Sequence, residues 1–143
     1  MQNKPDISHY LGIDYGKAKI GLAIADSETR IATAYGTLKN DASLFEKLME
    51  IVKKEGINKI IIGVNEVRGS TSSPLEVEPR IRFEVHLKSK LKTPIEYQDE
   101  MFTTKMAEHN LKEKGAKKIK RFDDQEAARI ILQSWLDRPS QIT

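Results

Sequence analysis

The chain has 143 residues, no cysteine and a formal net charge of +3, with a pI near 9.0. The missing cysteines exclude disulfides and thiolate metal sites, and no apolar run is long enough for a signal core or a membrane span. Because no linker-like composition divides the chain, we expect one soluble, cytoplasmic domain over residues 1–143. The mild basicity permits a polyanionic partner without requiring one.

A three-stranded meander is predicted near the start, after polar residues 1–8 that we expect to be frayed. Continuous apolar runs occupy Tyr10–Ile13 and Ile20–Ile24. The segment between them, Asp14–Lys19, contains a glycine and is too short for a helix, which favours an antiparallel hairpin. Arg30–Leu38 is a third strand-like run, close enough in sequence to pair antiparallel with the second.

Asp14 ends the first apolar strand abruptly with a carboxylate. One interpretation is that it accepts hydrogen bonds within the turn, as Asp residues beside a glycine commonly do. The other is that it holds a cation, or a metal-bound phosphate, at the mouth of the sheet. The neighbouring residues leave both interpretations open.

A helix and a buried strand are predicted next. Asn40 and Asp41 supply a candidate N-cap, and apolar residues then recur at helical spacing until Gly56: Leu44, Phe45, Leu48, Ile51 and Val52. Ile57–Val64 is a continuous apolar run, as expected for a strand that is covered on both faces. Because a helix precedes it, we expect this strand to lie parallel to the first.

The segment Ile81–Leu91 fits either an alternating strand or a helical stripe. We predict a helix there, because Ile95–Tyr97 looks like a further parallel strand, which needs a crossover of this length. Residues 65–79, which precede the helix, are rich in turn-forming residues and are predicted to form a loop. A further helix is predicted over Thr103–Lys114, where Gly115 ends it.

A cationic loop leads into the last predicted helix, and taken alone it has the composition of a solvated surface. Asp123 has the position of the N-cap in a capping box with Glu126. Asp124 is not needed for that cap. It shares a helical face with three apolar side chains that must pack on the sheet, Ala128, Ile131 and Trp135. We therefore expect Asp124 to point towards the sheet.

Acidic residues from distant segments are expected to meet at one edge of the sheet. Asp14 and Glu100 follow parallel strands, whose carboxyl ends lie at the same edge, whereas Asp26 should lie at the opposite edge and is excluded. Asp14, Glu100 and Asp124 therefore form a candidate carboxylate cluster. Crowded carboxylates repel one another unless a cation is present, and oxygen ligands without His or Cys favour Mg²⁺ or Mn²⁺.

Four ordered segments between Tyr10 and Asp137 resemble the YqgF (RuvX) family of bacterial nucleases: YLGIDYGKAKIGLAIAD, IIIGVNEVRGS, DEMFTT and FDDQEAARIILQSWLD. The resemblance implies an α/β, RNase H-like fold, with a five-stranded mixed sheet of order 3-2-1-4-5, an antiparallel second strand and flanking helices. It also implies a metal-dependent endonuclease. The family is described both as nucleases that mature the 5′ end of pre-16S rRNA, the activity we expect here, and as Holliday junction resolvases.

Three acids carry over from the family by position. Asp14 matches the acid of the first strand, Glu100 the acid of the Asp-Glu-Arg motif, and Asp124 the acid that heads the last helix. The resemblance implies that these three are catalytic and hold two Mg²⁺ or Mn²⁺ ions, with Asp14 bridging them. Glu66 could supply the second metal-bridging acid instead of Glu100, unless it is a solvent-exposed loop residue.

The sequence also departs from the family pattern. Ala18 and Lys19 stand where the family usually has Lys-Arg, and Met101 stands where it usually has arginine. The sequence of the middle loop also differs from that of the family. A lysine cannot match the two-pronged grip of arginine on phosphate. A weakly catalytic or non-catalytic nucleic-acid-binding module is therefore a further alternative. A sugar-kinase or actin-like ATPase is a weaker one, because those enzymes close two such domains around a nucleotide.

The expected partner is structured RNA or branched DNA, with no membrane, and the sequence leaves a monomer or a homodimer open. Eight side chains are candidates for contacting nucleic acid: Lys17, Lys19, Lys117, Lys118, Lys120, Arg121, Thr103 and Thr104. For the two threonines, helix capping is the alternative role. His9, His86 and His109 are scattered, and none is assigned a catalytic role.

Overall fold

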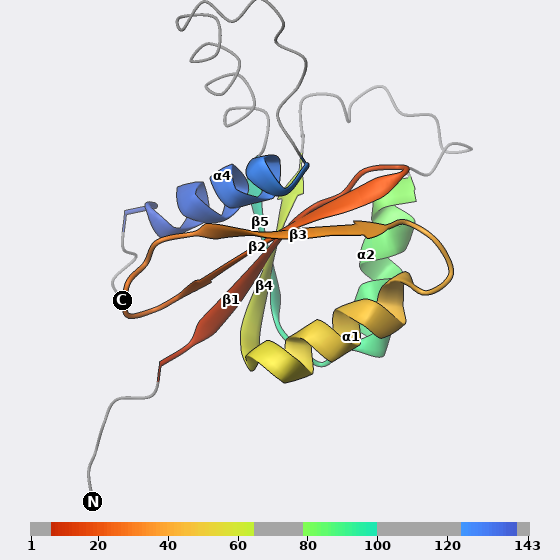
Figure 1. The fold of residues 1–143 in the computed structure, drawn as a ribbon, viewed down its shortest axis with the longest axis horizontal. Coiled ribbons are helices and arrows are strands. Elements are labelled where there is room, and N and C mark those ends of the chain that lie inside the picture. Colours follow the sequence, from red (N-terminus) through yellow and green to blue (C-terminus); the bar gives the residue numbers. More distant parts are fainter. Residues whose placement is uncertain (1–6, 65–78, 100–123, 140–143) are drawn as a thin grey trace, which may run out of the picture.

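A five-stranded mixed sheet separates two layers of helices in the computed structural model, which describes residues 7–64, 79–99 and 124–139 (Figure 1). The strand order is β3-β2-β1-β4-β5. The described elements are β1 (His9–Asp14), β2 (Lys19–Asp26), β3 (Thr33–Lys39), α1 (Leu44–Glu55), β4 (Ile57–Val64), α2 (Pro79–Lys90), β5 (Ile95–Asp99) and α4 (Asp124–Leu136). Strand β2 pairs antiparallel with both β1 and β3, whereas β1, β4 and β5 run parallel. This arrangement confirms the predicted fold class.

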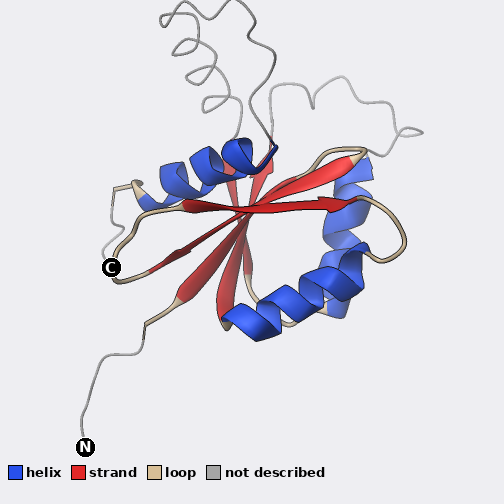
Figure 2. Ribbon diagram, in the orientation of Figure 1, coloured by secondary structure: helices blue, strands red, loops and turns tan. Residues whose placement is uncertain are grey.

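The alternation of side chains along the strands produces a separate core on each face of the sheet. Helices α1 and α2 cover one face, and α4 covers the other (Figure 2). The larger core contains Leu11, Ile13, Ile20, Leu22, Ile60 and Ile62 from the strands and Leu44, Leu48, Phe83 and Leu87 from the helices. The smaller core joins Ala23, Ala25 and Ile61 to Ala128, Ile131, Leu132 and Leu136 of α4.

Two glycines allow α4 to lie unusually close to the sheet. An ideal Cβ on Gly12 would lie 2.8 Å from Cβ of Leu132 and 3.2 Å from the carbonyl oxygen of Ala128. An ideal Cβ on Gly21 would overlap the backbone carbonyl of Asp124. Any side chain at either position would push the helix outward, so these glycines fix the height of α4 above β1 and β2.

The ambiguous segment before β5 is helical, as predicted. Phe83 and Leu87 are buried on one stripe of α2, whereas Val85 is 63% exposed and Ile81 is 42% exposed. An alternating strand would have buried Ile81 and Val85 together with Phe83, so the helical period accounts for the pattern.

The predicted start of the third strand was wrong. β3 begins at Thr33 rather than Arg30, because a tight turn occupies the residues before it. The Arg30 N–H donates to the Asp26 carbonyl at 3.0 Å, and Arg30 adopts a φ of 54°. A carboxylate oxygen of Asp26 also accepts from the N–H groups of Glu28 and Thr29. This turn leaves Ile31 outside the sheet and 64% exposed.

The predicted position of the N-cap of the first helix was also wrong. Ser43, not Asn40 or Asp41, is the N-cap residue of α1, and its side chain makes no capping hydrogen bond. Asp41 instead accepts from both the N–H and the hydroxyl of Ser43, at 2.9 and 2.7 Å. The pKa of Asp41 is lowered by these bonds, first by the one from the Ser43 side chain. Gly56 ends the helix in the left-handed conformation, as predicted.

Several predicted features lie outside the described residues. They are residues 1–6 of the predicted frayed segment 1–8, residues 65–78 of the predicted loop 65–79, the helix over 103–114, the cationic loop that follows it, and the cap at Asp123. The prediction was wrong for Ser8, whose N–H donates to the Ser27 hydroxyl and whose carbonyl accepts from the Ser27 N–H, both at 2.9 Å, and for Pro79, which begins α2. The single-domain assignment also stays a prediction. Within the described ranges, none of the helices is both long and apolar enough to cross a membrane.

Candidate active site at the carboxyl end of the parallel strands

Asp14 is the last residue of β1 and lies at the edge of the sheet where the parallel strands end. Ile13 pairs with Ile62 on β4, and Val64 of β4 pairs with Asp99, the last residue of β5. β1, β4 and β5 therefore present their carboxyl ends at a shared edge. Asp26 pairs with His9 at the other end of β1, as expected for the acid that was excluded.

The position of Asp14 in the strand places it on the face that α4 covers. Leu11 and Ile13 belong to the core beneath α1 and α2, whereas Gly12 contacts α4. Because successive side chains alternate between faces, Asp14 lies on the same face as Gly12. It is half-buried there.

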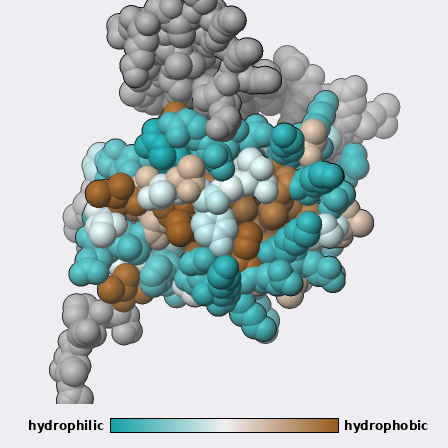
Figure 3. Space-filling view, viewed as in Figure 1, coloured by the Kyte–Doolittle hydropathy of each residue, from teal (hydrophilic) through white to brown (hydrophobic). Residues whose placement is uncertain are grey.

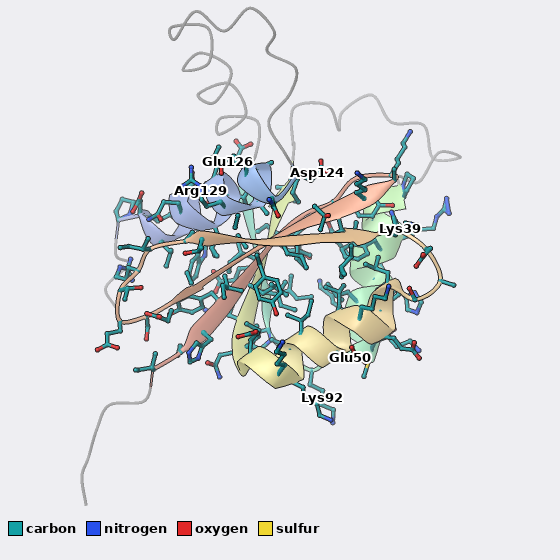
Figure 4. All side chains as sticks on the ribbon, viewed as in Figure 1. Lys39, Glu50, Lys92, Asp124, Glu126 and Arg129 are labelled. Carbon is teal, nitrogen blue, oxygen red and sulfur yellow. The ribbon has the colours of Figure 1, made fainter. Side chains whose placement is uncertain are left out.

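Asp124 lies over the strand neighbour of Asp14. It is the first residue of α4 and half-buried, and its Cβ is 3.0 Å from an ideal Cβ on Gly21. Gly21 pairs directly with Asp14 across β1 and β2. The two acids, separated by most of the chain, thus adjoin the same glycine on the same face of the sheet. Figure 4 shows Asp124 at the start of α4.

The helical face that carries Asp124 packs as its sequence pattern predicts. Ala128 and Ile131 are buried in the smaller core, and Trp135 packs against it. The Trp135 ring meets Tyr10 edge-on at 5.0 Å between centroids, and its Nε1–H donates to Glu96 of β5 at 2.9 Å. These contacts hold α4 in register with the sheet.

Further polar contacts fix the far end of α4. A side-chain oxygen of Gln133 accepts from the Ala32 N–H at 2.8 Å, beside the turn that precedes β3. Arg138 donates to the Tyr97 carbonyl at 2.8 Å and to the Gln98 side chain at 3.1 Å, on the edge strand β5. The helix is therefore tied to both sides of the sheet, and these distant contacts add to its packing on Gly12 and Gly21 in setting the position of Asp124.

Glu96 is a positioning residue that the sequence analysis missed. Its carboxylate accepts from Lys59 at 2.8 Å and from Trp135, so it links β4, β5 and α4. The hydrogen bond from Lys59 is the main reason that the pKa of Glu96 is lowered. Glu96 could have been paired with Lys59 only from the parallel register of β4 and β5, which local sequence does not specify.

Two of the predicted cations lie at the first hairpin turn, Lys17 within it and Lys19 at the start of β2. Lys17 and Lys19 are exposed. Asn40, directly after β3, pins this turn, because its backbone N–H donates to the Ala18 carbonyl at 2.9 Å and its side-chain amide donates to the Gly16 carbonyl at 2.8 Å. The two lysines therefore lie at the same end of the sheet as Asp14.

The remaining predicted site residues lie outside the described part of the chain: Glu66, Glu100, Thr103, Thr104, Lys117, Lys118, Lys120 and Arg121. Within residues 7–64, 79–99 and 124–139, no group of three or more acidic or histidine side chains is arranged to hold a metal ion. The described ranges thus contain two of the three predicted acids.

A cleft of about 270 Å³ lies at the opposite end of the sheet. It is lined by His9, Asp26, Thr29, Ile31, Glu55 and neighbouring residues, and it includes none of the predicted site residues. Asp26 is occupied within its own turn, where the hydrogen bond from the Thr29 N–H is the main cause of its lowered pKa. The cleft is therefore separate from the acids beside Gly21.

Comparisons with known proteins agree with this fold. A family model described as "RuvX: Holliday junction resolvase" matches residues 8–138. A protein of Corynebacterium diphtheriae is 32% identical over 94% of this chain and 87% of its own length, and one of Chloroflexus aurantiacus is 36% identical over 89% and 85%. A Bacteroides fragilis protein is 34% identical over 92% of this chain and 97% of its own. All three are named "Putative pre-16S rRNA nuclease".

Solved structures resemble the chain in fold at low sequence identity. RuvC of Thermus thermophilus superposes with a TM-score of 0.52 at 14% identity, covering 90% of this chain and 93% of RuvC. The large terminase nuclease of phage G20c superposes with a TM-score of 0.52 at 15% identity, covering 92% and 83%. The sequence matches confirm the predicted family and its nuclease class, and the chain belongs to the RuvX family.

Proposed function

We propose that the protein is a cytoplasmic, divalent-metal-dependent endonuclease that matures the 5′ end of pre-16S rRNA. The observation that carries the proposal is that Asp14 and Asp124 adjoin the same residue, Gly21, on one face of the sheet. The names of relatives that are 32 to 36% identical support the choice of substrate.

The donor set fits a hard divalent cation. Both side chains are carboxylates, and neither His nor Cys lies among the assigned residues, so Mg²⁺ or Mn²⁺ is preferred over Zn²⁺. Gly21 adds no side chain between the two acids, and the backbone of Asp124 occupies that space, so the start of α4 lies close to the residue that pairs with Asp14. Glu100 directly follows Asp99 at the end of β5, and we assign it as the third ligand.

The protein contributes rigid placement to the reaction. β1 is a central strand, paired on both sides, so Asp14 is held by its neighbours β2 and β4. Asp124 is held by the packing of α4 on Gly12 and Gly21. When bound, the divalent ions supply Lewis-acid stabilisation of the charge that develops on the phosphodiester oxygens. A fixed pair of carboxylates can hold such ions without reorganising during the reaction.

The proposal is tested by cleavage of an end-labelled RNA that contains the 5′ boundary of 16S rRNA, with Mg²⁺ or Mn²⁺ present. We expect a discrete product from the wild-type protein and at least a roughly hundred-fold slower reaction for Asp14→Asn and for Asp124→Asn. Asp26→Asn is the matched control, because Asp26 lies at the opposite end of β1. Equal rates for Asp14→Asn and the control would contradict the proposed mechanism.

Resolution of branched DNA is the second candidate, and the description of the matching family favours it. A four-way DNA junction of similar length, assayed beside the RNA, separates the two. Preferential, paired cleavage of the junction would replace the RNA assignment. Binding of either substrate without cleavage in Mg²⁺ or Mn²⁺ would instead identify a non-catalytic binding module.

A further inference from the structure

Two lysines are directly opposed at the end of the sheet that carries the acids. Lys19, the first residue of β2, pairs with Lys39, the last residue of β3. Both side chains are exposed, and within the described part of the chain neither ammonium group takes part in a salt bridge. Asp41 is close enough for Lys39 to contribute to its lowered pKa, but its carboxylate already accepts two hydrogen bonds from Ser43.

The lysine pair shares a face with Asp14 and Asp124. Ile20 and Leu22 point into the core beneath α1, so Lys19 lies on the opposite face, with Gly21. Directly paired residues have their side chains on one face, which places Lys39 there as well. Figure 4 shows Lys39 at the end of β3 and Asp124 at the start of α4, both towards this end of the sheet.

The spacing suits contact with a neighbouring phosphate. Lys19 lies on the strand next to Asp14, two residues along β2 from Gly21, which is the residue that pairs with Asp14. From ordinary strand spacings, its Cα lies about 8 Å from that of Asp14, and the Cα of Lys39 lies about 12 Å away. An extended lysine side chain spans part of that distance. Lys19 and Lys39 can therefore reach a phosphate next to the one that would lie at Asp14 and Asp124. The two lysines themselves lie outside the site that these acids form.

In the described ranges, the cations that lie over β4 and β5 are already engaged, and Lys59 pairs with Tyr10, near the amino end of β1. Lys59 of β4 forms an ion pair with Glu96 at 2.8 Å and lies over the Trp135 ring. Arg138 donates to the Tyr97 carbonyl and to Gln98. The described face is thus asymmetric, with committed cations over β4 and β5 and opposed ammonium groups over β2 and β3.

The opposed pair has an energetic consequence. Like charges directly across two antiparallel strands destabilise the pairing. Figure 3 shows hydrophilic side chains around the end of the sheet that carries the two lysines, whereas hydrophobic side chains gather between α1 and α4. Asn40 bonds to Gly16 and Ala18 and so holds the β1–β2 turn against the end of β3, which keeps the two lysines together. An anion between them would remove the repulsion.

We propose that Lys39, together with Lys19, binds a backbone phosphate of the RNA adjacent to the cleaved one. The RNA strand then runs from Asp14 across β2 towards β3, rather than towards β5. The inference rests on the proposed function and adds to it a direction for the substrate strand and a contact residue, Lys39.

Salt-dependent binding tests this path. The probe is a fluorescein-labelled RNA hairpin with a single-stranded 5′ extension, titrated with the full-length protein in Ca²⁺ at salt concentrations from 50 to 200 mM. Each phosphate contact contributes about 0.7 to 0.9 to the slope of log affinity against log salt, or roughly a three-fold loss of affinity over this range. Because both lysines contact one phosphate, we expect the slope to fall by about half that amount for Lys39→Gln, and by about the full amount for Lys19→Gln with Lys39→Gln.

Lys92→Gln is the matched control. Lys92 is also an exposed lysine, but it precedes the amino end of β5, away from the acids (Figure 4). Its substitution removes the same net charge and should leave the slope within about 0.2 of the wild-type value. A slope for Lys39→Gln equal to that of Lys92→Gln would overturn the inference, as would a wild-type protein that does not bind the probe.

Cleavage of the same RNA in Mg²⁺ separates this inference from the proposed function. If the wild-type protein cuts but the lysine variants keep its salt slope, the nuclease assignment stands and the lysine contact is wrong. If the wild-type protein does not cut but the lysine variants lose slope, the binding path stands and the nuclease assignment is wrong. A fold check by circular dichroism applies to every variant.

Discussion

Asp124 begins its helix directly above Gly21, the residue that pairs with Asp14 across the central strands. This relationship joins the last described helix to the first hairpin and brings two carboxylates to one edge of the sheet. It depends on a residue without a side chain, because an ideal Cβ at Gly21 would overlap the Asp124 backbone carbonyl. The glycine therefore has a positional role distinct from turn formation.

Replacing Gly21 with alanine is expected to lift the start of α4. The added methyl group meets backbone rather than a flexible side chain, so we predict a loss of about 1 to 3 kcal/mol in the free energy of unfolding. Urea denaturation followed by circular dichroism measures this. Thr37→Ala is the control, because Thr37 pairs with Gly21 from the exposed strand β3. It should change stability by less than about 0.5 kcal/mol, and equal effects would contradict the close-approach argument.

Trp135→Phe isolates the hydrogen bond between α4 and β5. Phenylalanine keeps an aromatic ring beside Tyr10 but cannot donate to Glu96, so we predict a loss of about 0.5 to 1.5 kcal/mol. A double-mutant cycle with Glu96→Ala, which removes the acceptor, apportions the effect when it is measured by chemical denaturation. Additive losses from the two substitutions would mean that the contact contributes no coupling.

The stability contributed by Glu96 should depend on pH. Its pKa is lower in the folded protein than its ordinary value of 4.5, first because of Lys59 and then with a contribution from Trp135. The unfolded chain then binds more protons in the acidic range, so stability rises with pH there. The contribution is complete above about pH 5 and disappears as the pH falls through the folded-state pKa.

The measurement is the difference in unfolding free energy between the wild-type protein and Glu96→Gln, from pH 7 down to pH 3. We expect this difference to shrink on acidification below pH 5. Asp137→Asn serves as the control, because Asp137 is exposed directly after α4 and its carboxylate accepts a hydrogen bond from the Gln133 side chain rather than from a cation. A Glu96→Gln difference that stays constant over the whole range would be inconsistent with a lowered pKa.

Lys39→Glu should move stability and binding in opposite directions. It replaces a like-charged pair with an opposite-charged pair across β2 and β3, which we expect to stabilise the fold by about 0.2 to 1 kcal/mol. It should also weaken RNA binding more than Lys39→Gln, because a carboxylate repels phosphate. Thermal unfolding and fluorescence anisotropy test the two effects in one preparation. Tighter binding together with higher stability would rule out a phosphate contact at Lys39.

The polarity of the strands could be predicted because it follows from local pattern, whereas the full sheet order was implied by the family resemblance. Buried strands such as Ile57–Val64 read as continuous apolar runs, and the helix before β4 requires a parallel return. Asp14 was found as a carboxylate at a strand end, and Asp124 as an acid that the capping box did not need. Both inferences use spacing within one element and the direction of the strands.

Features that depend on contacts between distant elements could not be predicted in this way. The ion pair of Lys59 with Glu96 needs the register of β4 against β5, and the opposition of Lys19 and Lys39 needs that of β2 against β3. The start of β3 was missed because the left-handed conformation of Arg30 ends the preceding turn, although arginine has no intrinsic preference for it. Such choices are made by tertiary contacts.

The most direct test of the shared acidic site is calorimetric titration of the protein with Mn²⁺, which has a readout independent of cleavage. We predict that Asp14→Asn and Asp124→Asn each weaken Mn²⁺ binding at least ten-fold, and that the double variant is little weaker than either, because both acids hold the same ions. Asp26→Asn should bind Mn²⁺ as the wild-type protein does. If Asp124→Asn instead bound Mn²⁺ with wild-type affinity, Asp14 and Asp124 would not form one metal site.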